Sequence, residues 1–184
     1  MLENLNFPNN ITLIYGPPAS GKTTLCLQLI TKTKGKILFI DTENSFNIER
    51  IKQIEPSINL DNIIVIKVKR YSEQFKAIKD LQETKNLKLI IIDSFTHFHR
   101  RKLQEKINIK PATIKMFQML RDLNIPIILT SQIYTDMKGN IHPIAEELFK
   151  HFSKYTIKLQ NKILKIEQLN LEIPYIITNN GLTS

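Results

Sequence analysis

One segment of the sequence has the residue types and spacing that could hold a chain of phosphates. Gly21 lets the backbone bend so that successive N–H groups point at a phosphate, and the helix expected after it adds the positive end of its dipole. Lys22 can reach the β- and γ-phosphates, and the Thr23 hydroxyl can ligate Mg²⁺. We therefore expect a nucleoside triphosphate with Mg²⁺ on this segment, which matches G-x-x-x-x-G-K-[ST] and continues one residue further: Gly16, Pro17, Pro18, Ala19, Ser20, Gly21, Lys22, Thr23 and Thr24.

Acidic and amide side chains follow the apolar runs that would lead to the same edge of a parallel sheet. Asp93 ends the run 89–92 and is the candidate that holds Mg²⁺ through water, while Asp41 and Glu43 end the run before it. Glu43 could act as general base, and Gln132 could orient the γ-phosphate or the attacking water. The plainer alternatives are a turn cap for Asp93, a solvated loop acid for Glu43 and a surface glutamine for Gln132.

The densest positive charge lies between Asp93 and Pro111, in a stretch that we expect to be a loop. Cations that follow a phosphate backbone, with rings that stack on bases, are typical of single-stranded DNA binding, and Phe95 and Phe98 are nearby. The alternatives are a solvated basic loop, with both phenylalanines in the core. The DNA-binding candidates here are Arg100, Arg101, Lys102 and Lys106, with Lys110 in the same stretch.

Composition limits the class of protein. The chain has 184 residues and a formal net charge of +9. It has one cysteine, which excludes a disulfide scaffold and a zinc site built on several cysteines. No apolar run approaches the ~20 residues of a membrane helix, so we expect no membrane contact and a cytoplasmic protein. The four histidines do not have zinc-site spacing and are expected on the surface or in loops: His97, His99, His142 and His151.

Short apolar runs that alternate with helix-like stretches predict an α/β fold with a mostly parallel sheet flanked by helices. The expected parallel strands are 11–15, 36–41, 63–68, 87–93 and 125–130. The expected helices are 22–32, 48–54, 72–83 with Ser72 as its N-cap, and one through 123 that Pro111 opens. Three short C-terminal strands, 155–159, 163–168 and 175–178, are expected to extend the sheet as an antiparallel meander.

Several stretches, in this order and at this spacing, resemble the RecA/RadA recombinase family, and most closely its archaeal RadB branch. The resemblance implies an ATPase core that binds ATP and Mg²⁺, with Glu43 as the catalytic glutamate, Asp93 as the Walker B aspartate and Arg50 packed on the adenine. It also implies that Gln132 couples the nucleotide to DNA, and that DNA-facing loops follow Asp93 and Gln132, the second carrying Lys138. The stretches are YGPPASGKTTL (15–25), IDTENSFNIERI (40–51), IIDSFTHFHR (91–100), NIPIILTSQIYTD (124–136) and ITNNGL (177–182).

These observations favour a DNA-binding ATPase of recombination and repair with weak, Mg²⁺-dependent hydrolysis. We expect one RecA-like core over residues 1–184, without the N-terminal helical DNA-binding domain of the family. Its expected partners are single-stranded DNA and a recombinase, nuclease or polymerase. Two other functions stay open: a nucleotide-regulated adaptor that binds ATP without hydrolysing it, and a small-molecule kinase that uses 100–102 as a lid.

Overall fold

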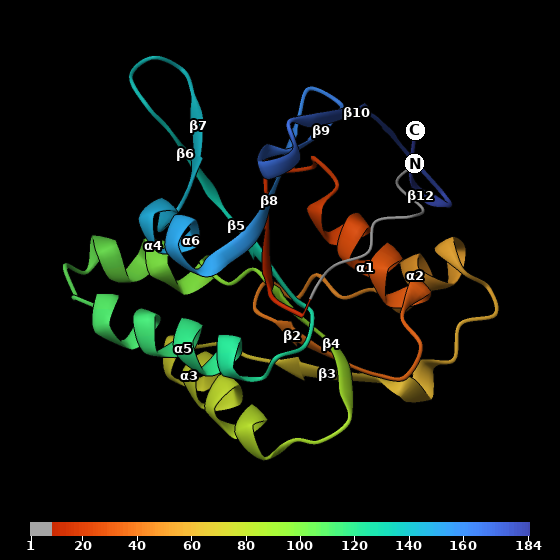
Figure 1. The fold of residues 1–184 in the computed structure, drawn as a ribbon, viewed down its shortest axis with the longest axis horizontal. Helices are drawn as coiled ribbons and strands as arrows, with labels where there is room; N and C mark the ends of the chain where they lie inside the picture. The colour runs from red at the N-terminus through yellow and green to blue at the C-terminus, as the bar shows by residue number, and fades with distance from the viewer. Residues whose placement is uncertain (1–8) are drawn as a thin grey trace.

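Apolar runs of the sequence form a central eight-stranded sheet (Figure 1). The computed structural model describes residues 9–184. The sheet order is β10-β9-β8-β1-β5-β4-β2-β3; the six strands from β8 to β3 are parallel, and β9 and β10 are added by antiparallel pairing. The eight strands are β1 (Ile11–Tyr15), β2 (Lys36–Asp41), β3 (Ile63–Lys67), β4 (Leu87–Asp93), β5 (Ile127–Ser131), β8 (Ser153–Gln160), β9 (Ile163–Ile166) and β10 (Leu171–Pro174).

Helices cover both faces of this sheet, because successive strand residues point to opposite sides. Ile14 and Phe39 pack with α1 and α2 in one cluster, whereas Leu13 and Ile40 pack with α3, α5 and α6 in the other. The described residues contain no helix long and apolar enough to span a bilayer. The helices are α1 (Lys22–Lys32), α2 (Ile48–Ile54), α3 (Tyr71–Asp80), α4 (His97–Gln104), α5 (Lys110–Asp122) and α6 (Glu146–Phe152), with 3-10 turns at Leu60–Asn62, Leu81–Glu83 and Glu167–Leu169.

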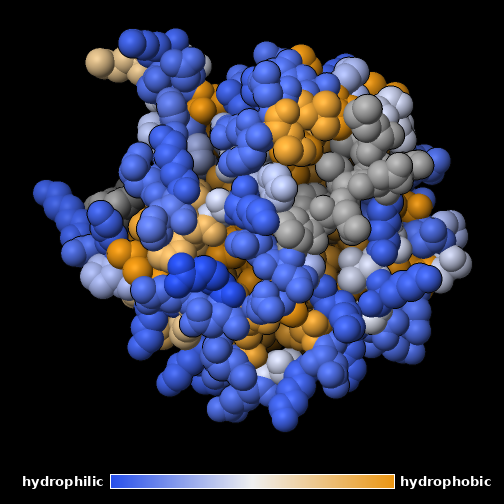
Figure 2. All heavy atoms as spheres, in the orientation of Figure 1, coloured by the Kyte–Doolittle hydropathy of each residue, from blue (hydrophilic) through white to orange (hydrophobic). Residues whose placement is uncertain are grey.

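Two short antiparallel ribbons lie outside this central sheet. The first joins β6 (Ile133–Thr135) to β7 (Ile141–Pro143) and extends from the carboxyl end of β5, and Figure 2 shows it standing out from the rest of the surface. The second joins β11 (Ile176–Thr178) to β12 (Gly181–Thr183) and packs beside α1. The C-terminal region therefore differs from the expected meander, since 176–178 lies in this separate ribbon and β8 joins β1 in parallel.

Two expectations about individual elements were also wrong, and one helix was not expected at all. Ser72 does not cap α3: the helix begins at Tyr71 and the N-cap is Arg70, so the serine lies inside the first turn. The basic stretch after Asp93 is not a plain loop, because residues 97–104 within it form α4. The helix α6, whose Phe149 and Phe152 fill the core, was not expected because seven residues give too short an apolar repeat to stand out.

Candidate nucleotide-binding site

The phosphate loop connects β1 to α1 at the carboxyl edge of the sheet. Its last residue, Gly21, has φ +93° and is the N-cap of α1, so the free N–H groups of the first helical turn face the loop. The Lys22 ammonium folds back over the loop and donates to the carbonyls of Gly16 and Pro17, each over 2.9 Å. Burial lowers the pKa of Lys22, while Asp93 and Glu43 act in the opposite direction. The ammonium therefore lies over the loop, where a bound phosphate could replace the two carbonyls as its partner.

Asp93 connects this loop to the central strands. The Thr23 hydroxyl donates to Asp93 Oδ2 over 2.7 Å, and the Ser45 hydroxyl donates to the same oxygen over 2.9 Å. Thr130 on β5 donates to the other oxygen, Oδ1, over 2.5 Å. Asp93 is only 2% exposed, and burial raises its pKa against the opposing effect of these three hydrogen bonds. One buried carboxylate therefore joins the phosphate loop, β4 and β5.

The two acids that follow β2 lie in different environments. Asp41 is buried and pairs with Asp93 in the strand register, but its oxygens accept the main-chain N–H groups of Ser45 at 2.9 Å and Phe46 at 3.1 Å. Asp41 therefore shapes the loop after β2. Glu43 is more exposed, and its Oε1 accepts the Gln132 amide over 2.8 Å. The structure thus brings together Glu43 and Gln132, which lie 89 positions apart in the sequence.

The C-terminal ribbon lies against the phosphate loop, a contact that no local pattern in the sequence predicts. The Tyr175 hydroxyl donates to the Ser20 carbonyl over 2.7 Å, and a Cβ on Gly21 would lie 3.1 Å from Ile177. Arg50 on α2 holds the other side of this ribbon, because its guanidinium donates to the Thr178 carbonyl over 2.6 Å and to the Asn179 carbonyl over 3.1 Å. Arg50 is thus placed at the ribbon beside the loop, and its contact with adenine stays a prediction.

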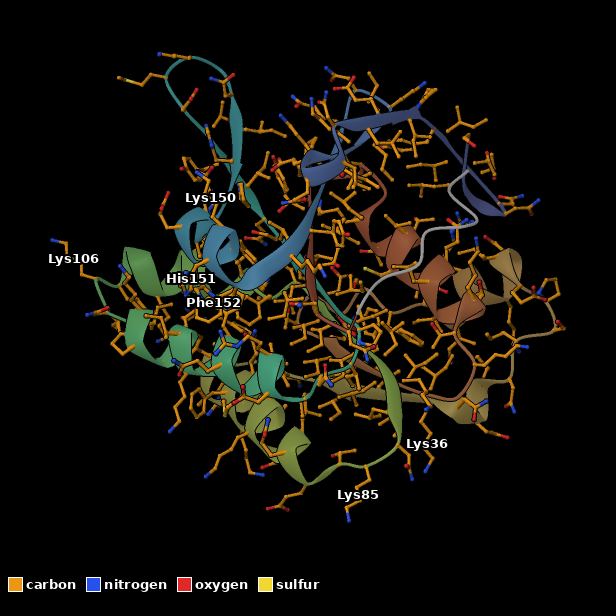
Figure 3. The ribbon with its side chains drawn as sticks, in the orientation of Figure 1. Lys36, Lys85, Lys106, Lys150, His151 and Phe152 are labelled. Atoms are coloured by element: carbon orange, nitrogen blue, oxygen red, sulfur yellow. The ribbon has the colours of Figure 1, made fainter. Side chains whose placement is uncertain are left out.

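The basic residues extend from the same edge of the sheet on α4 and on the β6–β7 ribbon. Arg101 and Lys102 both pair with Glu105, over 3.1 and 2.7 Å, whereas Arg100 is exposed. Lys106 lies at the outer end of α4 (Figure 3), and Lys138 is exposed in the β6–β7 turn. The two rings are not available to stack on bases, since Phe95 is fully buried and Phe98 is 8% exposed: Phe95 and Phe98 belong to the core.

One histidine, His99, differs from the surface or loop positions that we expected for all four. His99 is 4% exposed, and burial lowers its pKa to about 4. His97, at the start of α4, lies with its Nδ1 3.3 Å from Glu43 Oε1. Sequence reasoning missed this contact, although His97 follows Asp93 by only four positions on the same edge.

A cavity of about 440 Å³ lies away from the phosphate loop. It opens between the α4–α5 connection and the segment that leads from β7 into α6. Its lining is largely apolar and includes Ile107, Ile109, Ile144 and Leu148, with Tyr134 beside them. The cavity therefore separates the two segments that carry the candidate DNA-binding cations and is not part of the nucleotide site.

Comparisons with known proteins agree with this arrangement. A family model described as an AAA domain matches residues 9–168. The DNA repair and recombination protein RadB of Methanococcus maripaludis is 35% identical over 190 residues, which cover 94% of this chain and 87% of the relative. The protein of the same name from Thermococcus sibiricus is 32% identical, over 82% of this chain and 71% of the relative.

A solved structure shows the same fold. The crystal structure of the RadB recombinase superposes with a TM-score of 0.74 and 26% sequence identity, over 96% of this chain and 90% of that one. The RadB protein of Methanocaldococcus jannaschii adds a third relative in sequence, 33% identical over 82% of this chain and 77% of its own length. With its mostly parallel sheet, its phosphate loop and these relatives, the chain belongs to the RadB branch of the RecA/RadA recombinase family.

Proposed function

We propose that this chain binds Mg²⁺–ATP on its phosphate loop, hydrolyses it slowly and acts on DNA in recombination or repair. The observation that carries the proposal is the 2.7 Å hydrogen bond from Thr23 to Asp93, which places the last residue of the loop motif beside a buried strand-end carboxylate. The relatives named as DNA repair and recombination proteins support the role in repair.

The oxygen atoms at this point fit a magnesium ion. Thr23 offers a hydroxyl and Asp93 a carboxylate, the hard donors that Mg²⁺ prefers, and Asp93 would hold it through water. Mg²⁺ bound there would neutralise charge that develops on the β- and γ-phosphates. Lys22, released from the carbonyls of Gly16 and Pro17, would pair with the same phosphates, while the main-chain N–H groups of residues 20–24 would hold the β-phosphate.

Glu43 is the residue that we propose to activate the attacking water. Its Oε1 is held by the Gln132 amide, and Oε2 accepts no hydrogen bond from the described residues. Oε2 can therefore accept the proton of a water aimed at the γ-phosphate. The Glu43 side chain is 34% exposed, so this base works in contact with solvent, and hydrolysis should be slow for that reason.

The cations at the same edge support binding of single-stranded DNA. Arg100, Lys106 and Lys138 are exposed on two segments that both begin at the nucleotide site. A flexible phosphate backbone could follow these charges from α4 to the β6–β7 ribbon. DNA bound there would lie next to Gln132, which immediately precedes β6 and contacts Glu43.

The deciding experiment measures ATP hydrolysis with Mg²⁺ or with a chelator, in the presence and absence of single-stranded DNA. Lys22→Ala should abolish ATP binding, whereas Glu43→Gln should keep binding and lower turnover about 100-fold. Glu49→Gln is the matched control, because Glu49 is an exposed acid on the neighbouring α2 and should leave turnover unchanged.

Each alternative function has its own outcome in this assay. Tight ATP binding without phosphate release, even with DNA, would replace the ATPase by a nucleotide-regulated adaptor. Phosphate transfer to a nucleoside or sugar would indicate a kinase, and none of the relatives named above is one. Equal turnover in wild type and Glu43→Gln would show that Glu43 is not the base.

A further inference from the structure

Two side chains from different segments meet on one oxygen of Glu43. Gln132 Nε2 donates to Glu43 Oε1 over 2.8 Å, and His97 Nδ1 lies 3.3 Å from the same atom. Both side chains that face each other here are partly exposed, 37% for His97 and 34% for Glu43, so nothing in the surrounding packing forces this contact. The carboxylate is held from two sides, and its Oε2 is left for another ligand.

The backbone beneath this cluster is fixed by buried hydroxyl groups. The Thr42 hydroxyl donates to the Ser94 carbonyl over 2.8 Å and accepts the Ser94 N–H over 2.7 Å, which ties the end of β2 to the end of β4. The Thr96 hydroxyl lies 3.0 Å from the Ser131 hydroxyl and accepts the Gln132 main-chain N–H over 3.0 Å. These contacts tie the end of β4 to the end of β5. Three residues directly follow these anchored positions: Glu43, His97 and Gln132.

A glutamate on an exposed loop would otherwise exchange among several rotamers, and its carboxylate would face the nucleotide only part of the time. Two donors on Oε1 remove that freedom before the substrate binds. An imidazole whose Nδ1 carries the proton can donate to the carboxylate whether the ring is neutral or cationic. His97 also begins α4, and Gln132 precedes β6, so each predicted DNA-facing segment supplies one of the donors.

We infer that His97 is a positioning residue for ATP hydrolysis: with Gln132 it fixes the Glu43 carboxylate so that Oε2 points to the attacking water. The inference rests on the proposed ATPase function and adds to it a residue that touches neither ATP nor metal. His97 acts only through Glu43, so its loss should reduce turnover while leaving nucleotide affinity as it was.

The first test compares turnover and binding in two substitutions of the same residue. His97→Phe keeps an aromatic ring but removes the donor, and should lower kcat about tenfold with an unchanged Kd for a non-hydrolysable ATP analogue. His97→Asn places an amide nitrogen close to the position of Nδ1 and should restore most of this loss. His151→Phe is the matched control, since His151 is an exposed histidine on α6 without a contact to Glu43.

The second test does not depend on hydrolysis. Long-range ¹H–¹⁵N spectra in mildly alkaline buffer report which nitrogen of a neutral imidazole carries the proton. In the wild-type chain the hydrogen bond to Glu43 should hold the proton of His97 on Nδ1. Glu43→Ala should release it to Nε2, and His151 should show no change.

The outcomes separate this inference from the function on which it rests. A kcat that is unchanged in His97→Phe, an equal loss in His97→Asn, or a tautomer that ignores Glu43→Ala would overturn the role of His97 and leave the ATPase intact. Wild-type turnover no faster than that of Lys22→Ala would overturn the ATPase itself, and the role of His97 with it, while the spectra would still show whether the contact exists.

Discussion

Gln132 Nε2 lies 2.8 Å from Glu43 Oε1, so the residue that links β5 to the β6–β7 ribbon holds the proposed general base directly. The two side chains come from the ends of β2 and β5, which are separated by β4 in the sheet. Movement of the ribbon would therefore change the position of Glu43 without an intervening residue. A ligand on the ribbon and a nucleotide on the loop could influence each other through this single contact.

Gln132→Glu should shift the pH dependence of ATP turnover. The substitution places a second carboxylate beside Glu43, and two such groups cannot both ionise freely, so the pKa of the pair's last proton rises. A protonated Glu43 cannot act as base, and the acid limb of the kcat profile should therefore move to higher pH. The profile is measured for wild type and variant between about pH 5 and pH 9.

Gln118→Glu is the control for the added charge. Gln118 is exposed on α5, away from the nucleotide site, and its substitution should leave the profile where it was. If Gln132→Glu lowers kcat by the same factor at every pH, the two side chains do not share a proton and the contact with Glu43 is not maintained during turnover.

Gly181→Ala should loosen the C-terminal ribbon. Gly181 has φ +104°, and an added Cβ would lie 2.8 Å from Gln28 Oε1. The buried Gln28 amide accepts the Leu182 N–H over 2.9 Å and donates to the Leu182 carbonyl over 3.2 Å. Backbone strain and the displaced amide together should lower the free energy of unfolding by about 2–3 kcal/mol, measured by urea denaturation.

Gly139→Ala provides a matched comparison, because Gly139 also has a positive φ, +83°, but an added Cβ would meet nothing within 4 Å. The free energy of unfolding of this variant should fall by only about 1 kcal/mol, because of backbone strain. Gly181→Ala should in addition weaken ATP binding, since Ile177 of the same ribbon packs against Gly21. Equal losses in the two variants would show that the Gln28 contact does not hold the ribbon.

Local sequence signals were sufficient for the parts of this fold that are built locally. The phosphate loop was predicted because its chemistry is contained in one continuous motif. Five of the parallel strands, β1 to β5, were predicted because buried parallel strands are unbroken apolar runs. Pro111 opened α5 as expected, because a fixed φ and a missing N–H suit the first turn of a helix. The prediction for Ser72 was wrong because serine is favoured at a cap but is also tolerated two positions after it, inside the first turn.

The contacts that define the site could not be predicted in the same way. The pairs Glu43–Gln132 and Ser20–Tyr175 are 89 and 155 positions apart, and only the strand order and the C-terminal ribbon bring them together. Phe98 lies just before the basic residues of α4 in the sequence but faces the core, because each helix residue is rotated by about 100° from the one before it. In each of these cases the arrangement of the strands and helices in space, rather than residue type, determines which residues are in contact.

Substitutions on α4 should change the affinity for single-stranded DNA in opposite directions. Arg100→Ala with Arg101→Ala and Lys102→Ala should weaken binding and reduce the slope of log K against log salt by about 2, because each cation that neutralises a phosphate contributes ~0.7. Glu105→Gln should strengthen binding, since it frees Arg101 and Lys102 from their pairs with Glu105. Both are measured by fluorescence anisotropy at several salt concentrations.

The control removes the same charge elsewhere. Lys34, Lys36 and Lys85 are exposed at the opposite edge of the sheet, and Figure 3 shows Lys36 and Lys85 far from Lys106. Their triple alanine variant should keep the salt slope of the wild-type chain. If it loses as much affinity as the α4 variant, binding depends on net charge alone and α4 is not the DNA-binding segment.

His99 should make the folded chain sensitive to acid. Its Nε2 lies 2.9 Å from Thr113 Oγ1, and its buried Nδ1 is left without a partner among the described residues. Burial lowers the pKa of His99 to about 4, against ~6.5 in the unfolded chain. Between these values the unfolded chain binds the proton and the folded chain does not, so stability falls as the pH falls.

Lowering the pH from 7.5 to 5 should therefore remove about 2 kcal/mol of unfolding free energy through His99 alone. His99→Phe keeps a ring beside Phe95 and Tyr71 but cannot titrate. Between pH 7.5 and pH 5 its free energy of unfolding should therefore fall by about 2 kcal/mol less than that of the wild-type chain. Urea denaturation at each pH measures the difference, in which the carboxylates common to both proteins cancel. His151→Phe removes an exposed histidine and should follow the wild-type curve; parallel curves for wild type and His99→Phe would mean that His99 is protonated as easily in the folded chain as in the unfolded one.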